Sequence, residues 1–121
     1  MSSKTIREAL NDALREEMER DSTVIVMGCE VGIKGNPFGI TMDLYKQFGL
    51  ERVIDTPISE ASFTGMAIGA AATGLRPVVE IMFCDWVTLA MDQIVNMAAK
   101  MRYMFGGLVE MPLVVRVPIG A

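Results

Sequence analysis

Hydrophobic and polar positions follow two different periods along this chain. Between residues 5 and 19, apolar side chains recur every three or four positions against charged ones, which predicts an amphipathic helix. Thr5 and Glu8 stand at capping-box spacing at its start. Further helices are predicted over residues 41–48, opened by Thr41, and over 59–73 and 86–105.

Short, continuous apolar runs lie between these helices. They predict strands over residues 23–27, 52–55, 78–83 and 113–117. Strands that alternate with helices indicate an α/β fold, with a parallel sheet and helices on both of its faces. Ligands of such folds bind outside the carboxyl ends of the strands. The pattern does not determine the order of the strands.

One carboxylate opens the helix predicted over 59–73. Glu60 is followed by no charged residue from 61 to 73. An acid in the first turn of a helix is favoured by the helix dipole, and this alone explains a glutamate there. A carboxyl group held among apolar walls instead has a raised pKa and can serve as a proton partner for a cofactor nitrogen. The residues leave both interpretations open.

The same helix is built largely from glycine and alanine, at Gly65, Ala67 and 69–72. Such a face allows close packing, either on the chain's own sheet or against another subunit. Met82 and Trp86, around the end of the third predicted strand, are core residues or the walls of a flat slot for a heteroaromatic ring. The glycine-rich stretch 28–39 lacks both the P-loop ending and the GxGxxG spacing, so we expect a mobile loop near a site or an interface.

Composition narrows the functional classes. The 121 residues fit one domain, and 51% of them are hydrophobic, with a mean hydropathy of +0.36, which suggests faces that bury against another chain. A net charge of −4 argues against nucleic-acid binding. No apolar run reaches transmembrane length, so no membrane association is expected.

Histidine is absent from the chain, and Cys29 and Cys84 lie far apart. This excludes zinc sites built on His and Cys, and every nucleophile–histidine pair. We expect two inert, buried thiols in a reducing cytoplasm. The chain stops directly after a strand-like run, at Arg116-Val-Pro-Ile-Gly-Ala, whereas domains seldom end on a fresh core strand. We therefore expect a truncated chain.

Several motifs occur together in one order. They are Asp-Thr-Pro-Ile-Ser-Glu (55–60), Gly-Met-Ala-Ile-Gly-Ala-Ala (65–71), Gly-Leu-Arg-Pro (74–77), Glu-Ile-Met-Phe (80–83), Asp-Gln-Ile-Val-Asn (92–96), Ala-Ala-Lys (98–100) and Arg-Tyr-Met-Phe-Gly-Gly (102–107). With them, nearly the whole chain resembles the β chain of the thiamine-diphosphate-dependent decarboxylating component of 2-oxo acid dehydrogenase complexes. Pyruvate, branched-chain 2-oxo acid and acetoin dehydrogenases make up this family.

The resemblance implies that residues 1–121 are a partial, transketolase-like pyrimidine-binding domain and that the C-terminal domain is absent. It implies an α2β2 assembly in which the α chain holds diphosphate and magnesium and the β chain holds the aminopyrimidine of thiamine diphosphate. The acid matching Glu60 hydrogen-bonds the pyrimidine nitrogen and thereby activates the cofactor. The acyl group then passes from the 2-oxo acid or acetoin to the lipoyl arm of a partner acyltransferase.

By position, Met82 and Trp86 match the walls of the pyrimidine pocket, with Ile58 beside them, and Leu113 matches a backbone ligand of a structural potassium ion. Trp86 stands where the family usually has Phe or Tyr, and Cys29 lies where many members read Gly-Glu-Asp-Val. The family's active-site histidine falls beyond residue 121, so we expect the chain alone to be inactive. Two alternatives remain: the same domain of a transketolase-like enzyme, or a non-catalytic remnant that only binds an α-type partner.

Overall fold

The computed structural model of the chain describes residues 3–120. Its helices are α1 (Ile6–Arg20), α2 (Leu44–Phe48), α3 (Glu60–Ala72), α4 (Val87–Asp92) and α5 (Ala99–Met104), with a 3₁₀ turn η1 (Cys84–Trp86) and a π-helical segment η2 (Gln93–Ala98). Its strands are β1 (Val24–Gly28), β2 (Val53–Asp55), β3 (Arg76–Glu80) and β4 (Val114–Arg116). Within this part of the chain, no helix is long and apolar enough to cross a membrane.

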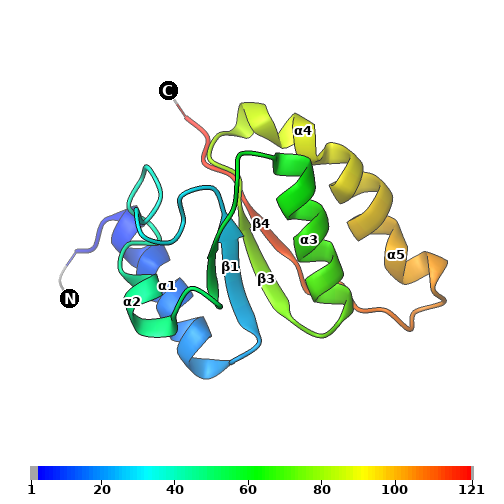
Figure 1. The fold of residues 1–121 in the computed structure, drawn as a ribbon, viewed down its shortest axis with the longest axis horizontal. Helices are drawn as coiled ribbons and strands as arrows, with labels where there is room; N and C mark the ends of the chain where they lie inside the picture. The colour runs from blue at the N-terminus through cyan, green and yellow to red at the C-terminus, as the bar shows by residue number, and fades with distance from the viewer. Residues whose placement is uncertain (1–2, 121) are drawn as a thin grey trace.

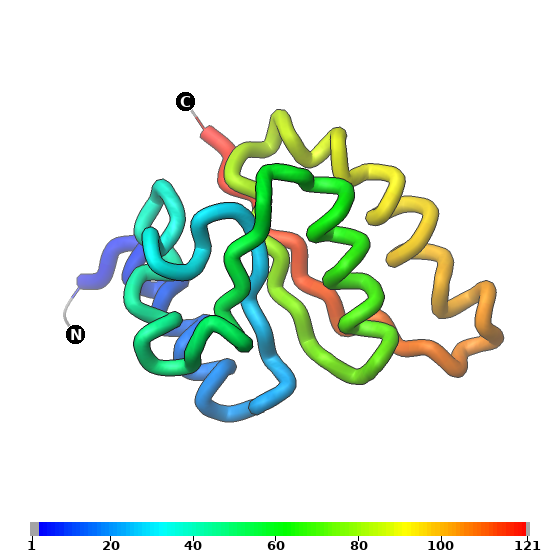
Figure 2. The backbone as a smooth tube through the Cα atoms, viewed as in Figure 1, coloured from blue at the N-terminus to red at the C-terminus, as the bar shows by residue number. Residues whose placement is uncertain are grey.

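The four strands form one parallel sheet in the order β2-β1-β3-β4. Helices α1 and α2 lie on one side of it and α3, α4 and α5 on the other (Figure 1). The predicted α/β architecture, with helices on both faces, is therefore confirmed. Strand β2 lies on one side of β1 and strand β3 on the other. After β2 the chain therefore crosses over β1 to reach β3, as the tube in Figure 2 traces. The gap between the carboxyl ends of β1 and β3 is thus a topological switch point, where α/β folds bind ligands.

Strand β1 is buried on both faces and joins two apolar clusters. Ile25 and Met27 pack with Phe63 of α3, whereas Val24 and Val26 pack with Met18 of α1. This alternation explains why the strand reads as an unbroken apolar run, because each face needs its own apolar side chains. The helices are fixed to the sheet through these two clusters.

Helix α1 begins as predicted. The backbone N–H of Glu8 donates to the Thr5 hydroxyl over 3.2 Å, and the backbone N–H of Thr5 donates to the Glu8 carboxylate over 2.8 Å. The predicted start of α2 at Thr41 was wrong, because the helix begins only after Asp43. Thr41 is buried, and its hydroxyl has no hydrogen-bond partner within the described residues. Asp43 has a left-handed backbone (φ 63°), which delays the helix.

The third strand begins and ends earlier than predicted, at Arg76 rather than 78 and at Glu80 rather than 83. Pro77 is tolerated inside it for a geometric reason. The N–H of Arg76 bonds to the Thr23 carbonyl at the start of β1, so the nitrogen of Pro77 faces the other neighbour, β4. The pairing with β4 starts only at Val78, and no N–H is needed from Pro77.

The long helix predicted over residues 86–105 is instead a succession of α4, η2 and α5 after the η1 turn. The π-helical segment lies against α3, where Gly65 faces the side chain of Gln93. A Cβ on Gly65 would lie 3.1 Å from Gln93 Oε1, closer than side chains normally approach. The glycine therefore allows the two helices to pack tightly. Hydrophobic periodicity does not distinguish a π turn from the α-helix that surrounds it.

Candidate functional site

Glu60 is the first residue of α3, at the edge of the sheet formed by the carboxyl ends of the strands. Its side chain is half-buried, and within residues 3–120 its carboxylate has neither an ion-pair nor a hydrogen-bond partner. The preceding Ser59 uses its hydroxyl on Ser62, at 2.8 Å, and does not cap the helix. An acid in the first turn is thus left available to a ligand.

The other predicted pocket residues differ in exposure. Ile58 is 77% exposed, Trp86 is 48% exposed and Met82 is half-buried. The core interpretation is wrong for Trp86, because the η1 turn that carries it projects beyond the end of β3. Figure 1 shows η1 and the start of α4 beside the start of α3, and the two helices are in contact. The exposure of Trp86 and Ile58 leaves both side chains available to a ligand, and the slot interpretation stays a prediction.

The two cysteines occupy different environments. Cys29 follows β1 and is buried, whereas Cys84 is exposed, which corrects the expectation that both thiols are buried. Burial, and then the negative charges of Glu30, Asp55 and Glu60, raises the pKa of the Cys29 thiol. Three carboxylates therefore act on one point beyond the ends of β1 and β2. Such an electronegative site favours a ligand that donates hydrogen bonds.

The glycine-rich segment 28–39 is held to the sheet at two points. Asp55, the last residue of β2, accepts hydrogen bonds from the N–H groups of Gly32 over 2.7 Å and Ile33 over 3.4 Å. Asn36, which is buried, donates from Nδ2 to Glu80 Oε1 over 3.1 Å. The segment lies at the predicted site, but these contacts describe an anchored loop rather than a mobile one.

The pair Glu80–Arg116 is the feature that sequence reasoning missed. Glu80 ends β3 with a fully buried side chain, and the register of the sheet places it opposite Arg116 of β4. Arg116 donates from Nε to Oε2 over 2.5 Å and from Nη2 to Oε1 over 2.7 Å. In the sequence, Glu80 was only an interruption of an apolar run. An acid within one predicted strand and an arginine within the next were the available signal.

Leu113 lies just before β4, at the amino edge of the sheet, opposite the edge that carries Glu60. The potassium prediction depends on its backbone carbonyl alone. Within the described residues, no group of three or more His, Cys, Asp or Glu side chains could hold a metal ion. The backbone potassium ligand at Leu113 stays a prediction.

The small residues of α3 face in two directions. Ala67 is buried in the apolar cluster beneath the helix, Ala71 is also buried, and Gly65 packs against Gln93. Gly69 and Ala72 are exposed, and nothing lies within 4 Å of a Cβ placed on Gly69. Close packing within the chain therefore explains part of this composition and leaves the outer face of the helix unexplained.

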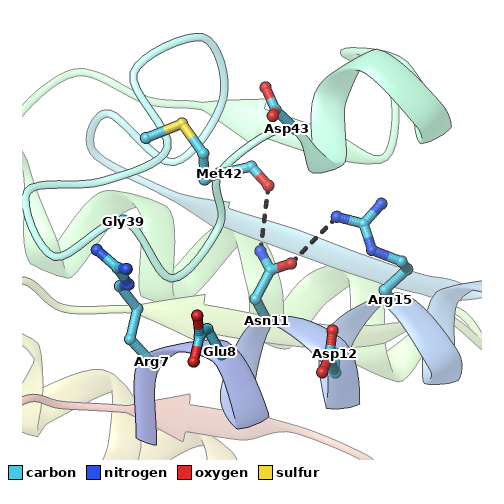
Figure 3. Close-up of a pocket in the computed structure, with 8 residues that line it drawn as sticks. All are labelled: Arg7, Glu8, Asn11, Asp12, Arg15, Gly39, Met42 and Asp43. Carbon is cyan, nitrogen blue, oxygen red and sulfur yellow. Dashed lines mark hydrogen bonds between the residues drawn. The ribbon is translucent and has the colours of Figure 1, made fainter. Parts of the chain in front are cut away.

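Two hollows lie near these elements. One of about 250 Å³ lies at the start of α3 and is lined by Asp55, Thr56, Pro57, Ser59, Ser62, Phe63 and Met66; Glu60 is not part of its lining. The other, of about 320 Å³, lies between α1 and the segment 39–43 and is drawn in Figure 3. There, Asn11 donates to the carbonyl oxygens of Ile40 and Met42 over 2.6 and 3.1 Å and accepts from Arg15 over 3.1 Å. These bonds attach the segment to α1, and no predicted site residue lines this hollow.

Together these features define a doubly wound parallel α/β domain whose candidate site, centred on an unpaired acid, lies at the carboxyl edge of the sheet. Sequence comparison gives the family: residues 2–121 match the family described as the transketolase, pyrimidine binding domain, and the chain belongs to it.

Named relatives are similar over nearly the whole chain. The pyruvate dehydrogenase E1 component subunit beta of Rickettsia bellii is 55% identical over 117 residues, which are 97% of this chain and 36% of that protein. The 2-oxoisovalerate dehydrogenase subunit beta of Bacillus subtilis is 48% identical over 120 residues, 99% of this chain and 37% of that protein. The chain thus spans little more than a third of the length of these relatives.

Proposed function

We propose that this chain is the pyrimidine-binding part of a β subunit of a thiamine-diphosphate-dependent 2-oxo acid dehydrogenase component. The proposal is supported by membership of the pyrimidine-binding family and by the similarity to pyruvate and 2-oxoisovalerate dehydrogenase β subunits. The observation that carries it is the Glu60 carboxylate, half-buried at the carboxyl edge of the sheet and without a partner in residues 3–120.

Each residue of the site has a proposed role. Glu60 hydrogen-bonds a ring nitrogen of the aminopyrimidine and holds the proton shared with it. Ile58, Met82 and Trp86 wall the ring and keep water from the acid. Thiamine diphosphate, held by these residues through its aminopyrimidine, would supply the nucleophilic carbon chemistry that decarboxylation of a 2-oxo acid needs. Ile58 and Trp86 are exposed in this chain, and we propose that a second chain closes the pocket over them.

That second chain is the α-type subunit in the proposed assembly. In the proposed assembly it would bind the diphosphate and magnesium, as the family resemblance implies. A lipoyl-bearing acyltransferase would accept the acyl group. The substrate is a 2-oxo acid or acetoin, and we place the assembly in the cytoplasm. The Leu113 carbonyl remains a proposed potassium ligand.

The test is Glu60→Gln in the full-length protein assembled with its α-type partner. Glutamine keeps the shape of the side chain but cannot exchange a proton, so kcat is expected to fall about 10²–10⁴-fold. The matched control is Glu51→Gln, because Glu51 is exposed and lies before β2, away from this edge. Near-normal turnover of Glu60→Gln would overturn the assigned role.

The substrate measurement separates the alternatives. We expect thiamine-diphosphate-dependent decarboxylation of pyruvate or of a branched 2-oxo acid, or cleavage of acetoin. Ketol transfer between sugar phosphates would instead identify a transketolase-like enzyme. An assembly that binds its partner but turns over none of these compounds would support the non-catalytic alternative.

A further inference from the structure

The buried contacts around Glu80 connect the far edge of the sheet to the loop beside the proposed site. Arg116 holds both oxygens of the Glu80 carboxylate, and the Oε1 oxygen also accepts from Asn36 Nδ2 over 3.1 Å. The whole Glu80 residue is 1% exposed and Asn36 is 5% exposed. A buried carboxylate with several donors is fixed in position, because any displacement leaves a charge without hydrogen bonds.

Asn36 connects the fixed Glu80 carboxylate to the backbone of the 28–39 loop. Its backbone is left-handed (φ 59°), and its Oδ1 accepts from the N–H groups of Phe38 over 2.8 Å and Ile40 over 3.3 Å. Its own N–H donates to the carbonyl of Glu30 over 2.7 Å. The side chain of Asn36 therefore organises the turn that follows it, while its backbone closes the loop back onto Glu30.

Glu30 is the residue through which these hydrogen bonds connect to the edge of the sheet that carries the proposed site. It follows β1 by two residues, has a left-handed backbone (φ 58°), and pairs with Lys34 within the loop. The end of β1 is paired with the end of β2, and the Thr56 N–H donates to the Gly28 carbonyl over 3.0 Å. Glu30 and Glu60 thus leave neighbouring strand ends at the same edge of the sheet.

We propose that Asn36 and Glu80, with Arg116 behind them, are positioning residues of the proposed cofactor site: they fix the 28–39 loop and thereby place Glu30 beside the edge that carries Glu60. The inference rests on the proposed function. None of the three side chains needs to touch cofactor or substrate, and all three act through the conformation of the loop.

The link can be broken with little change of shape. Asn36→Asp keeps the acceptor used by Phe38 and Ile40 but replaces the donor to Glu80 with a second carboxylate oxygen. Adding Glu80→Gln to this variant restores the bond in the opposite direction, because the glutamine amide donates to the new carboxylate at position 36. The glutamine oxygen keeps the bond from Arg116 Nε, whereas Arg116 Nη2 loses its acceptor, because the same Glu80 oxygen receives both Nη2 and Asn36 in the wild type. Asn11→Asp is the matched control, since Asn11 bonds from α1 to the carbonyl oxygens of Ile40 and Met42 and, among the described residues, makes no hydrogen bond to the 28–39 loop.

The measurements are made on the full-length protein assembled with its partner. Hydrogen exchange of the loop amides, without cofactor, reports the anchor itself. In Asn36→Asp we expect the amides of residues 36 and 38 to exchange about tenfold faster, with those of β1 and β3 unchanged. We also expect kcat to fall about tenfold, with a smaller change in the KM for substrate, and the double variant to recover a measurable part of both the exchange protection and kcat.

Three outcomes would overturn the inference. Unchanged exchange in Asn36→Asp would remove the anchor. Faster exchange with unchanged kcat would leave a loop contact of no consequence for the site. A loss of kcat equal in Asn11→Asp, or one not recovered by the second substitution, would indicate general destabilisation. A wild-type assembly with no thiamine-diphosphate-dependent activity would instead overturn the proposed function, and the positioning role with it.

Discussion

The backbone N–H of Gly32 donates to Oδ1 of Asp55 over 2.7 Å, and this bond joins the loop after β1 to the carboxyl end of β2. The contact requires glycine, because a Cβ on residue 32 would lie 2.6 Å from Oδ2 of the same carboxylate. Asp55 is thus a support for the site loop, and the N–H groups of the loop are directed at the protein's own carboxylate. The two N–H groups that Asp55 occupies, those of Gly32 and Ile33, are therefore not free to bind a phosphate.

Gly32→Ala is expected to destabilise the protein by about 1–3 kcal/mol, because the new methyl group displaces the Asp55 carboxylate from a charge-assisted hydrogen bond. Urea unfolding measures the change. In an Asp55→Ala background the methyl group meets no carboxylate, and the same substitution should cost little. An equal cost in both backgrounds would show that backbone strain, and not the contact with Asp55, excludes a side chain at this position.

The two thiols should differ in reactivity. Cys84 is exposed, whereas burial and the neighbouring carboxylates raise the pKa of Cys29 and keep its thiol protonated near neutral pH. A thiol-alkylating reagent at about pH 8 should modify Cys84 at least about tenfold faster, since the thiolate is the reacting form. Cys84→Ser should leave only the slow phase and Cys29→Ser only the fast one. Equal rates in the folded protein would contradict the buried placement of Cys29.

Some parts of the fold follow from short-range physics and could be predicted. The capping box at Thr5 depends on residues three positions apart. The burial of β1 on both of its faces is indicated by its unbroken apolar run. The start of β3 could not be predicted, because the tolerance of Pro77 depends on where the pairing with the neighbouring strand begins. Strand order likewise depends on long-range packing.

The site divides in the same way. Glu60 could be singled out because it is an acid at the head of an uncharged helix. The anchors at Asp55, Asn36 and Glu80 could not, because each joins residues at least 22 positions apart in the sequence. The exposure of Trp86 also depends on tertiary structure, since a 3₁₀ turn and not its composition takes it out of the core.

The start of α1 should contribute a pH-dependent increment to stability. The backbone N–H and the hydroxyl of Thr5 hydrogen-bond to the Glu8 carboxylate and lower its pKa in the folded state. The stabilisation is therefore fully present above the unfolded pKa, at about 4.3, and is lost as the pH falls through the folded value. In Glu8→Gln, unfolding followed between about pH 2 and about pH 6 should show a shallower loss of stability. Identical profiles would rule out this contribution.

Arg116→Met should be among the most destabilising single changes, because it leaves the Glu80 carboxylate buried without its partner. Breaking a buried ion pair in this way costs about 3–5 kcal/mol. Replacing both residues, as Glu80→Met with Arg116→Met, removes the stranded charge and should recover at least about 2 kcal/mol of that loss. Recovery should stay incomplete, since Asn36 then lacks its acceptor.

The control for this pair is Arg102→Met. Arg102 is exposed on α5 and has no ion-pair partner within the described residues, so its replacement should change the unfolding free energy by about 0.5 kcal/mol or less. Urea unfolding of these variants, together with Glu80→Met alone, gives the coupling between residues 80 and 116 directly. If Arg116→Met alone were as mild as Arg102→Met, the Glu80 carboxylate would have to reach solvent or another donor when the arginine is removed. The pair would then not be the fixed support that its burial indicates.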